Sequence, residues 1–115
     1  MQSFEKRHFI RARADFPVTI ELLGRTEAHY PSKALDISID GIHLCSEADL
    51  PLEAALVLYF PEDWGGICVI AKAVRRIGNN YGCQFLDMQP SARKMLDTTV
   101  YRYWRQNAHS VFHDG

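Results

Sequence analysis

The sequence lacks the features that mark membrane-spanning, secreted and metal-binding chains. No apolar run approaches the roughly 20 residues that a membrane helix needs, and the opening stretch MQSFEKRHFIRARADF has no uninterrupted apolar segment of the kind found in a secretory signal. The three cysteines, at positions 45, 68 and 83, are too widely spaced for a C-x-x-C metal motif and too few for a disulfide framework. We therefore expect a cytoplasmic protein with reduced thiols, no metal site and no membrane insertion.

Two further absences narrow the class of function. The chain has no G-x-x-x-x-G-K phosphate loop, no paired-carboxylate magnesium site and no assignable nucleophile–base pair, so we expect a binding protein and not an enzyme. Its formal net charge of −1 provides no broad basic surface, which argues against a general nucleic-acid binder. The basic residues near the N-terminus nevertheless form a small local patch.

The 115 residues, 47% of them apolar, are enough for one globular domain with a closed core. Short stretches rich in apolar and β-branched residues predict about six strands, near residues 16–22, 33–40, 42–46, 55–60, 67–77 and 81–88, with GRTEAHYPS (24–32) as a loop. Pro90 is well placed to begin a helix, and apolar residues then recur at helical spacing. The pattern predicts an all-β fold, a small antiparallel barrel or sandwich, with a C-terminal helix covering one open side.

We expect three segments along the chain. Residues 1–13 form an arm without core residues, residues 14–107 form the barrel and its helix, and residues 108–115 form a frayed tail. The arm contains the basic patch, which includes Lys6, Arg7, His8, Arg11 and Arg13.

The stretch KALDISIDGIHL (33–44) carries polar groups on one face of a predicted strand. Strict alternation turns the apolar residues Leu35, Ile37 and Ile39 inward and the polar residues Asp36, Ser38 and Asp40 outward. If the first hairpin turns near residues 26 and 27, antiparallel pairing places Arg11 near Ile42 and Arg13 near Asp40. The basic arm is then expected beside the polar face.

These residue types together suit a guanine nucleotide with more than one phosphate. Arginines bind phosphates, or the O6 and N7 acceptors of guanine, with paired hydrogen bonds. The ionised Asp36 offers only acceptors, which match the N1–H and N2–H₂ donors on another edge of guanine. Ser38 can donate or accept, and Gly41 permits close approach to the backbone.

Two of these stretches resemble the signature motifs of the PilZ domain, a family of bacterial receptors for cyclic di-GMP. RHFIR supplies R-x-x-x-R with Arg7 and Arg11, and DISIDG supplies D-x-S-x-x-G with Asp36, Ser38 and Gly41. The later stretch YGCQFLDMQPSARKML is similar to the last strand and following helix of that family.

The resemblance implies a six-stranded antiparallel β-barrel with a C-terminal helix and a ligand, cyclic di-GMP, lying across its outer face. Arg7 and Arg11 would hold guanine edges and phosphates, Asp36 and Ser38 would read a guanine, and Gly41 would permit the tight turn. Lys6, His8 and Arg13 are secondary candidates. Family members with arginine in place of Lys6 tend to take an intercalated ligand dimer, so the number of bound molecules stays open.

The resulting hypothesis is a cyclic di-GMP receptor that changes conformation on binding and signals to an unidentified protein partner. Tyr101 and Trp104, in YRYWR, are candidates for the surface that meets this partner. Two alternatives stay open: a PilZ-like interaction module of the type IV pilus kind that binds no nucleotide, and an oligonucleotide-binding small barrel. The five histidines are interpreted as surface residues, of which His8 is also a candidate for stacking on a base, and Arg75 and Arg76 are interpreted as part of a solvated strand face.

Overall fold

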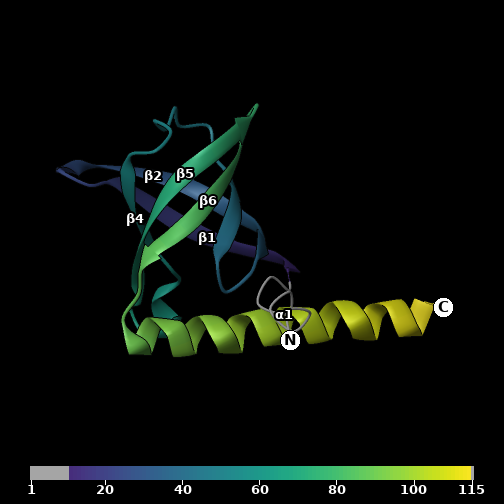
Figure 1. Cartoon of the computed structure of the whole chain (residues 1–115). Coiled ribbons are helices and arrows are strands. Elements are labelled where there is room, and N and C mark those ends of the chain that lie inside the picture. The colour runs from purple at the N-terminus through teal and green to yellow at the C-terminus, as the bar shows by residue number, and fades with distance from the viewer. Residues whose placement is uncertain (1–10, 115) are drawn as a thin grey trace, which may run out of the picture.

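The computed structural model describes the backbone of residues 11–114, with side chains for residues 11–24 and 28–107. Six antiparallel strands close into a barrel in the order β1-β2-β3-β6-β5-β4. Their bounds are β1 Ala12–Leu22, β2 Arg25–Ile37, β3 Gly41–Cys45, β4 Ala55–Tyr59, β5 Cys68–Ile77 and β6 Asn80–Asp87, and a 3₁₀ turn η2 (Glu62–Trp64) and the helix α1 (Pro90–Asp114) complete the fold. The predicted six-stranded barrel with a C-terminal helix is confirmed (Figure 1).

Helix α1 crosses one end of the barrel (Figure 1) and adds apolar side chains to its core. Leu96 is fully buried and belongs to the same apolar cluster as the barrel interior, together with Ala92 and Val100. Phe16 of β1 joins strand and helix, because its ring centroid lies 5.8 Å from that of Tyr103 and 4.8 Å from that of Trp64. The apolar face read from the sequence therefore does cover an open end of the barrel. Among the described residues, no helix combines the length and apolar character needed to span a bilayer.

The first hairpin differs from the prediction in its turn and in its register. Residues 24–32 were expected to form a loop, but β2 already begins at Arg25 and runs for 13 residues. The chain reverses at Leu23–Gly24, where Gly24 has a φ of +91° that glycine adopts without steric cost. Arg13 therefore pairs with Asp36, so the expected pairings of Arg13 near Asp40 and of Arg11 near Ile42 are wrong.

The ends of the barrel and helix also lie elsewhere than the sequence pattern suggested. Strand β1 begins at Ala12, which is buried, so it includes the last two residues assigned to the arm. The backbone of α1 continues to Asp114, through most of the segment assigned to a tail, and its C-terminal part runs past the barrel (Figure 1).

Tyr81 of β6 fastens the long connection between β3 and β4 to the barrel. Its side chain is fully buried, and its hydroxyl donates to the Ala48 carbonyl (2.8 Å) and accepts from the Leu50 amide (3.0 Å). Tyr81→Phe leaves both backbone groups without this partner, so we expect it to lower the free energy of unfolding by about 1–3 kcal/mol. Urea unfolding measures the change, with Tyr101→Phe on the exposed face of α1 as the control. Equal stability of the two variants would contradict this role.

Candidate functional site

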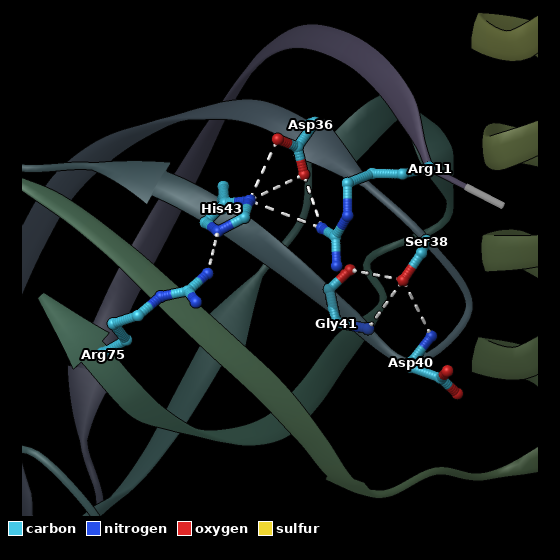
Figure 2. Close-up of polar contacts among 7 residues, drawn as sticks. All are labelled: Arg11, Asp36, Ser38, Asp40, Gly41, His43 and Arg75. Atoms are coloured by element: carbon cyan, nitrogen blue, oxygen red, sulfur yellow. Dashed lines mark hydrogen bonds and ion pairs between the residues drawn. The ribbon is translucent and has the colours of Figure 1, made fainter. Parts of the chain in front are cut away.

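Asp36 on β2 is the centre of a polar cluster on the outer face of the barrel (Figure 2). Arg11 Nη1 donates to Asp36 Oδ1 at 2.6 Å, although the two residues lie 25 positions apart in the sequence. His43 Nδ1, on β3, lies 2.9 Å from each carboxylate oxygen of Asp36. The side chains of Asp36 and Arg11 are 24% and 46% exposed, so a ligand can reach both. Arg11, the second arginine of R-x-x-x-R, is thus in contact with Asp36, the first residue of D-x-S-x-x-G.

A β-bulge turns Asp36 and its neighbour outward together. The pairing of β2 with β3 shifts between Ala34 and Asp36, and both Ala34 and Ile37 are fully buried. Leu35 and Asp36 lie between these two inward residues and are both partly exposed. The prediction that Leu35 points into the core is therefore wrong, because strict alternation does not hold across a bulge. Leu35 instead provides an apolar wall beside the carboxylate.

Ser38 shapes the turn between β2 and β3. Its side chain is fully buried, and Oγ accepts from the amides of Asp40 (3.1 Å) and Gly41 (3.2 Å). The Ser38 amide donates to the Gly41 carbonyl at 2.9 Å, which closes the turn. A serine side chain bonded to the backbone two and three residues ahead is a common way to fix such a turn. The prediction that Ser38 points outward is therefore wrong, because its side chain lies below the surface on which Asp36 lies, and its contact with a ligand stays a prediction.

Gly41 permits a close approach between strands β3 and β6. A Cβ atom at this position would lie 2.3 Å from the carbonyl oxygen of Cys83. The preceding residue, Asp40, has a buried Oδ2 for which the described residues provide no hydrogen-bond partner, so the expectation that Asp40 is solvated is wrong for this oxygen. The backbone of Asp40 is also held, because its carbonyl accepts from the Phe85 amide at 2.9 Å.

A depression of about 350 Å³ adjoins Asp36; it is lined by Leu35, Asp36, His43, Arg75, Ile77, Asn80 and Gly82. Arg75 Nη2 lies 3.3 Å from His43 Nε2, which extends the polar cluster from β2 to β5 (Figure 2). Sequence reasoning missed both His43 and Arg75. The signal lies in the strand register, because His43 pairs with Gly82, which in turn pairs with Arg75.

The remaining sequence candidates fall into two groups. Arg13 is exposed and pairs with Asp36 through the strand ladder, and the structure shows no hydrogen bond or ion pair between the two side chains. Lys6, Arg7 and His8 lie outside the described residues.

A second polar cluster lies further along β1, beside a cavity of about 530 Å³. Glu21 is buried and accepts a hydrogen bond from the Tyr59 hydroxyl, and His29 Nε2 lies 3.7 Å from the same carboxylate oxygen. This hydrogen bond to Glu21, with burial, raises the pKa of Tyr59 above its usual value. Because these groups satisfy one another, we assign this cluster to the stability of the barrel. Among the side chains that the structure describes, in residues 11–24 and 28–107, no three His, Cys, Asp or Glu groups are arranged to hold a metal ion.

The cluster around Asp36 combines a carboxylate acceptor, two guanidinium donors and the apolar side chains of Leu35 and Ile77. Such a surface matches a flat polar ring that offers both donors and acceptors, with anionic groups beside it. Fold and site together define a small barrel domain with a polar cluster and an adjoining depression on its outer face.

The family model described as PilZ domain matches residues 5–102, and the chain belongs to this family. No curated protein matches the chain. Among solved structures, the PilZ domain of CeSA from a cellulose-synthesizing bacterium is 14% identical with a TM-score of 0.65, over 79% of this chain and 94% of that one. The PilZ domain of YcgR from Escherichia coli, solved with c-di-GMP, is 15% identical with a TM-score of 0.60, over 88% and 93% of the two chains. MrkH from K. pneumonia, in its apo state, is 17% identical with a TM-score of 0.67, over 87% of this chain and 51% of that one.

Proposed function

We propose that this chain is a bacterial cytoplasmic receptor that binds cyclic di-GMP, changes conformation and passes the signal to a protein partner, without turnover and without a cofactor. The observation that carries the proposal is the contact of Arg11 with Asp36, which unites the two motifs beside a depression. Membership of the PilZ family and the likeness to a YcgR domain solved with c-di-GMP support the choice of ligand.

The two residues have complementary tasks in this proposal. Arg11 presents further N–H donors for phosphate oxygens or for the acceptor edge of a guanine. Asp36 accepts one bond from Arg11 and contacts His43, and a carboxylate has about four acceptor positions, so it can also receive a guanine donor edge. Arg7, outside the described residues, is expected to add a second guanidinium.

Isothermal titration of the purified chain with cyclic di-GMP tests the proposal. We expect saturable heat with a dissociation constant in the micromolar range or below, and the fitted stoichiometry answers whether one or two molecules bind. Asp36→Asn replaces an acceptor of guanine donors by an amide, and we expect it to weaken binding at least about tenfold. Absence of heat at tens of micromolar ligand, from a chain with a folded circular-dichroism spectrum, would refute the proposal.

Helix α1 offers a surface for the protein partner. Tyr101 and Trp104 are both exposed, as predicted, and their rings stack with centroids 6.1 Å apart. The guanidinium of Arg105 lies 5.9 Å from the centre of the Tyr101 ring. Aromatic and arginine side chains are enriched among residues that dominate protein interfaces, which supports a contact through this helix.

A further inference from the structure

Arg75 lies at the end of the Asp36 cluster that neither motif reaches (Figure 2). It is exposed on β5, and its guanidinium crosses the position of Gly82 on β6 to reach His43 on β3. A Cβ atom on Gly82 would lie 3.2 Å from His43 Nε2 and 3.6 Å from Arg75 Nη2. The missing side chain of Gly82 therefore gives His43 and Arg75 room to meet across β6, at the depression that Gly82 also lines.

The donor and acceptor atoms of Asp36, His43 and Arg75 determine the direction of each hydrogen bond among these three side chains. A carboxylate accepts only, so His43 Nδ1, at 2.9 Å from both Asp36 oxygens, carries the proton that it donates there. The contact of Nδ1 with Arg11 Nη1 is longer, at 3.4 Å, which agrees with this assignment. In the neutral ring, Nε2 is then the acceptor for Arg75 at 3.3 Å. Arginine has five N–H donors, so this one contact leaves most of them available to a ligand.

We propose that Arg75 is a further ligand-contacting residue, which binds the O6 and N7 acceptors of the same guanine whose N1–H and N2–H₂ donors Asp36 receives. The base lies over Gly82, and Leu35 and Ile77 form the apolar walls around it. This inference rests on the proposed function and adds the recognition of a second edge of the base. His43 stays bonded to Asp36 and positions its carboxylate.

Contacts of Asp36 and Arg75 with two edges of the base discriminate guanine from adenine. Adenine presents the N1 acceptor where Asp36 also offers only acceptors, and an amino donor in the place of O6, where Arg75 also offers only donors. The contact with Asp36 then loses its complementarity, and Arg75 keeps only the N7 acceptor. A bidentate arginine–guanine pair contributes about 1–3 kcal/mol of discrimination, which corresponds to roughly 5- to 150-fold in affinity.

The test compares Arg75→Met, which keeps an apolar stem, with wild type by isothermal titration. We expect the variant to bind cyclic di-GMP at least about tenfold more weakly. With the analogue in which carbon replaces N7 of each guanine, we expect a clearly smaller loss, because part of the contact is already missing. Arg76→Met is the matched control, since Arg76 contacts Asp49 and the Gly78 carbonyl, and it should bind like wild type.

The outcomes separate this inference from the proposed function. If wild type binds and Arg75→Met binds equally well, Arg75 does not contact the ligand and the inference is wrong. An equal loss with both ligands would assign Arg75 to a phosphate and would overturn the reading of the guanine edge. Failure of wild type itself to bind would instead refute the proposed receptor function.

Discussion

Replacing Gly41 by alanine is expected to destabilise the protein by about 3 kcal/mol, at the upper end of what an added methyl group costs in a packed structure. The new Cβ atom would lie 2.3 Å from the Cys83 carbonyl oxygen, a backbone atom held within the β3–β6 ladder. Relief requires the two strands to separate where Ile42 pairs with Cys83. For a domain of this size we expect the melting temperature to fall by about 10 °C.

Gly82→Ala is the matched control for this substitution. It adds the same methyl group to a residue of β6, but the nearest atom is the imidazole Nε2 of His43 at 3.2 Å, which belongs to a side chain that can move. We expect a loss below about 1 kcal/mol for this variant, since a rotamer shift relieves the contact. Urea unfolding of both variants gives the comparison, and a Gly41→Ala protein as stable as Gly82→Ala would contradict the argument.

The fold could be predicted because local patterns of apolar residues in the sequence indicate its strands and its helix. The apolar stretches at 55–60 and 67–77 coincide with β4 and β5, and Pro90 begins α1 as expected. Register was not predictable to the same degree. The turn lies at Leu23–Gly24, three residues before the predicted position, and after the register shift between Glu21 and Leu22 this places Arg13 opposite Asp36 and not Asp40.

The site was predictable where it depends on residue type and not where it depends on register. Arg11 and Asp36 were expected together, and they are in contact. The bulge that exposes Leu35 has no residue signature, because it depends on how β2 meets β3. His43 and Arg75 come together through Gly82 on a strand between them, a relation that only the barrel closure reveals.

The D-x-S-x-x-G stretch contains two residues that support a turn and one, Asp36, that the proposed function assigns to ligand contact. Ser38 bonds the amides of the turn, and Gly41 lets β3 pack against β6. These contacts fix the turn that follows Asp36, whose carboxylate is the exposed member of the three motif residues. Loss of ligand binding in a Ser38 or Gly41 variant therefore calls for a stability measurement beside the titration, whereas Arg11 offers a test without that complication.

Arg11→Glu is expected to abolish cyclic di-GMP binding at tens of micromolar ligand, a loss of at least about 100-fold. The change removes the donor that contacts Asp36 at 2.6 Å and places a second carboxylate beside it. Like charges brought together at a binding surface cost several kcal/mol, and here both the Asp36 carboxylate and the ligand phosphates repel the new group. Stability should change by less than about 1 kcal/mol, because the Arg11 side chain is 46% exposed and such ion pairs contribute little.

Arg102→Glu makes the same change in net charge on an exposed residue of α1 and serves as the control. Titrations of both variants at low and at high salt separate a direct contact from a long-range charge effect, since salt screens only the latter strongly. We expect Arg102→Glu to bind within about threefold of wild type and Arg11→Glu to fail at both salt concentrations. An Arg11→Glu protein that binds as well as Arg102→Glu would remove Arg11 from the site, and with it the contact on which the proposed function depends.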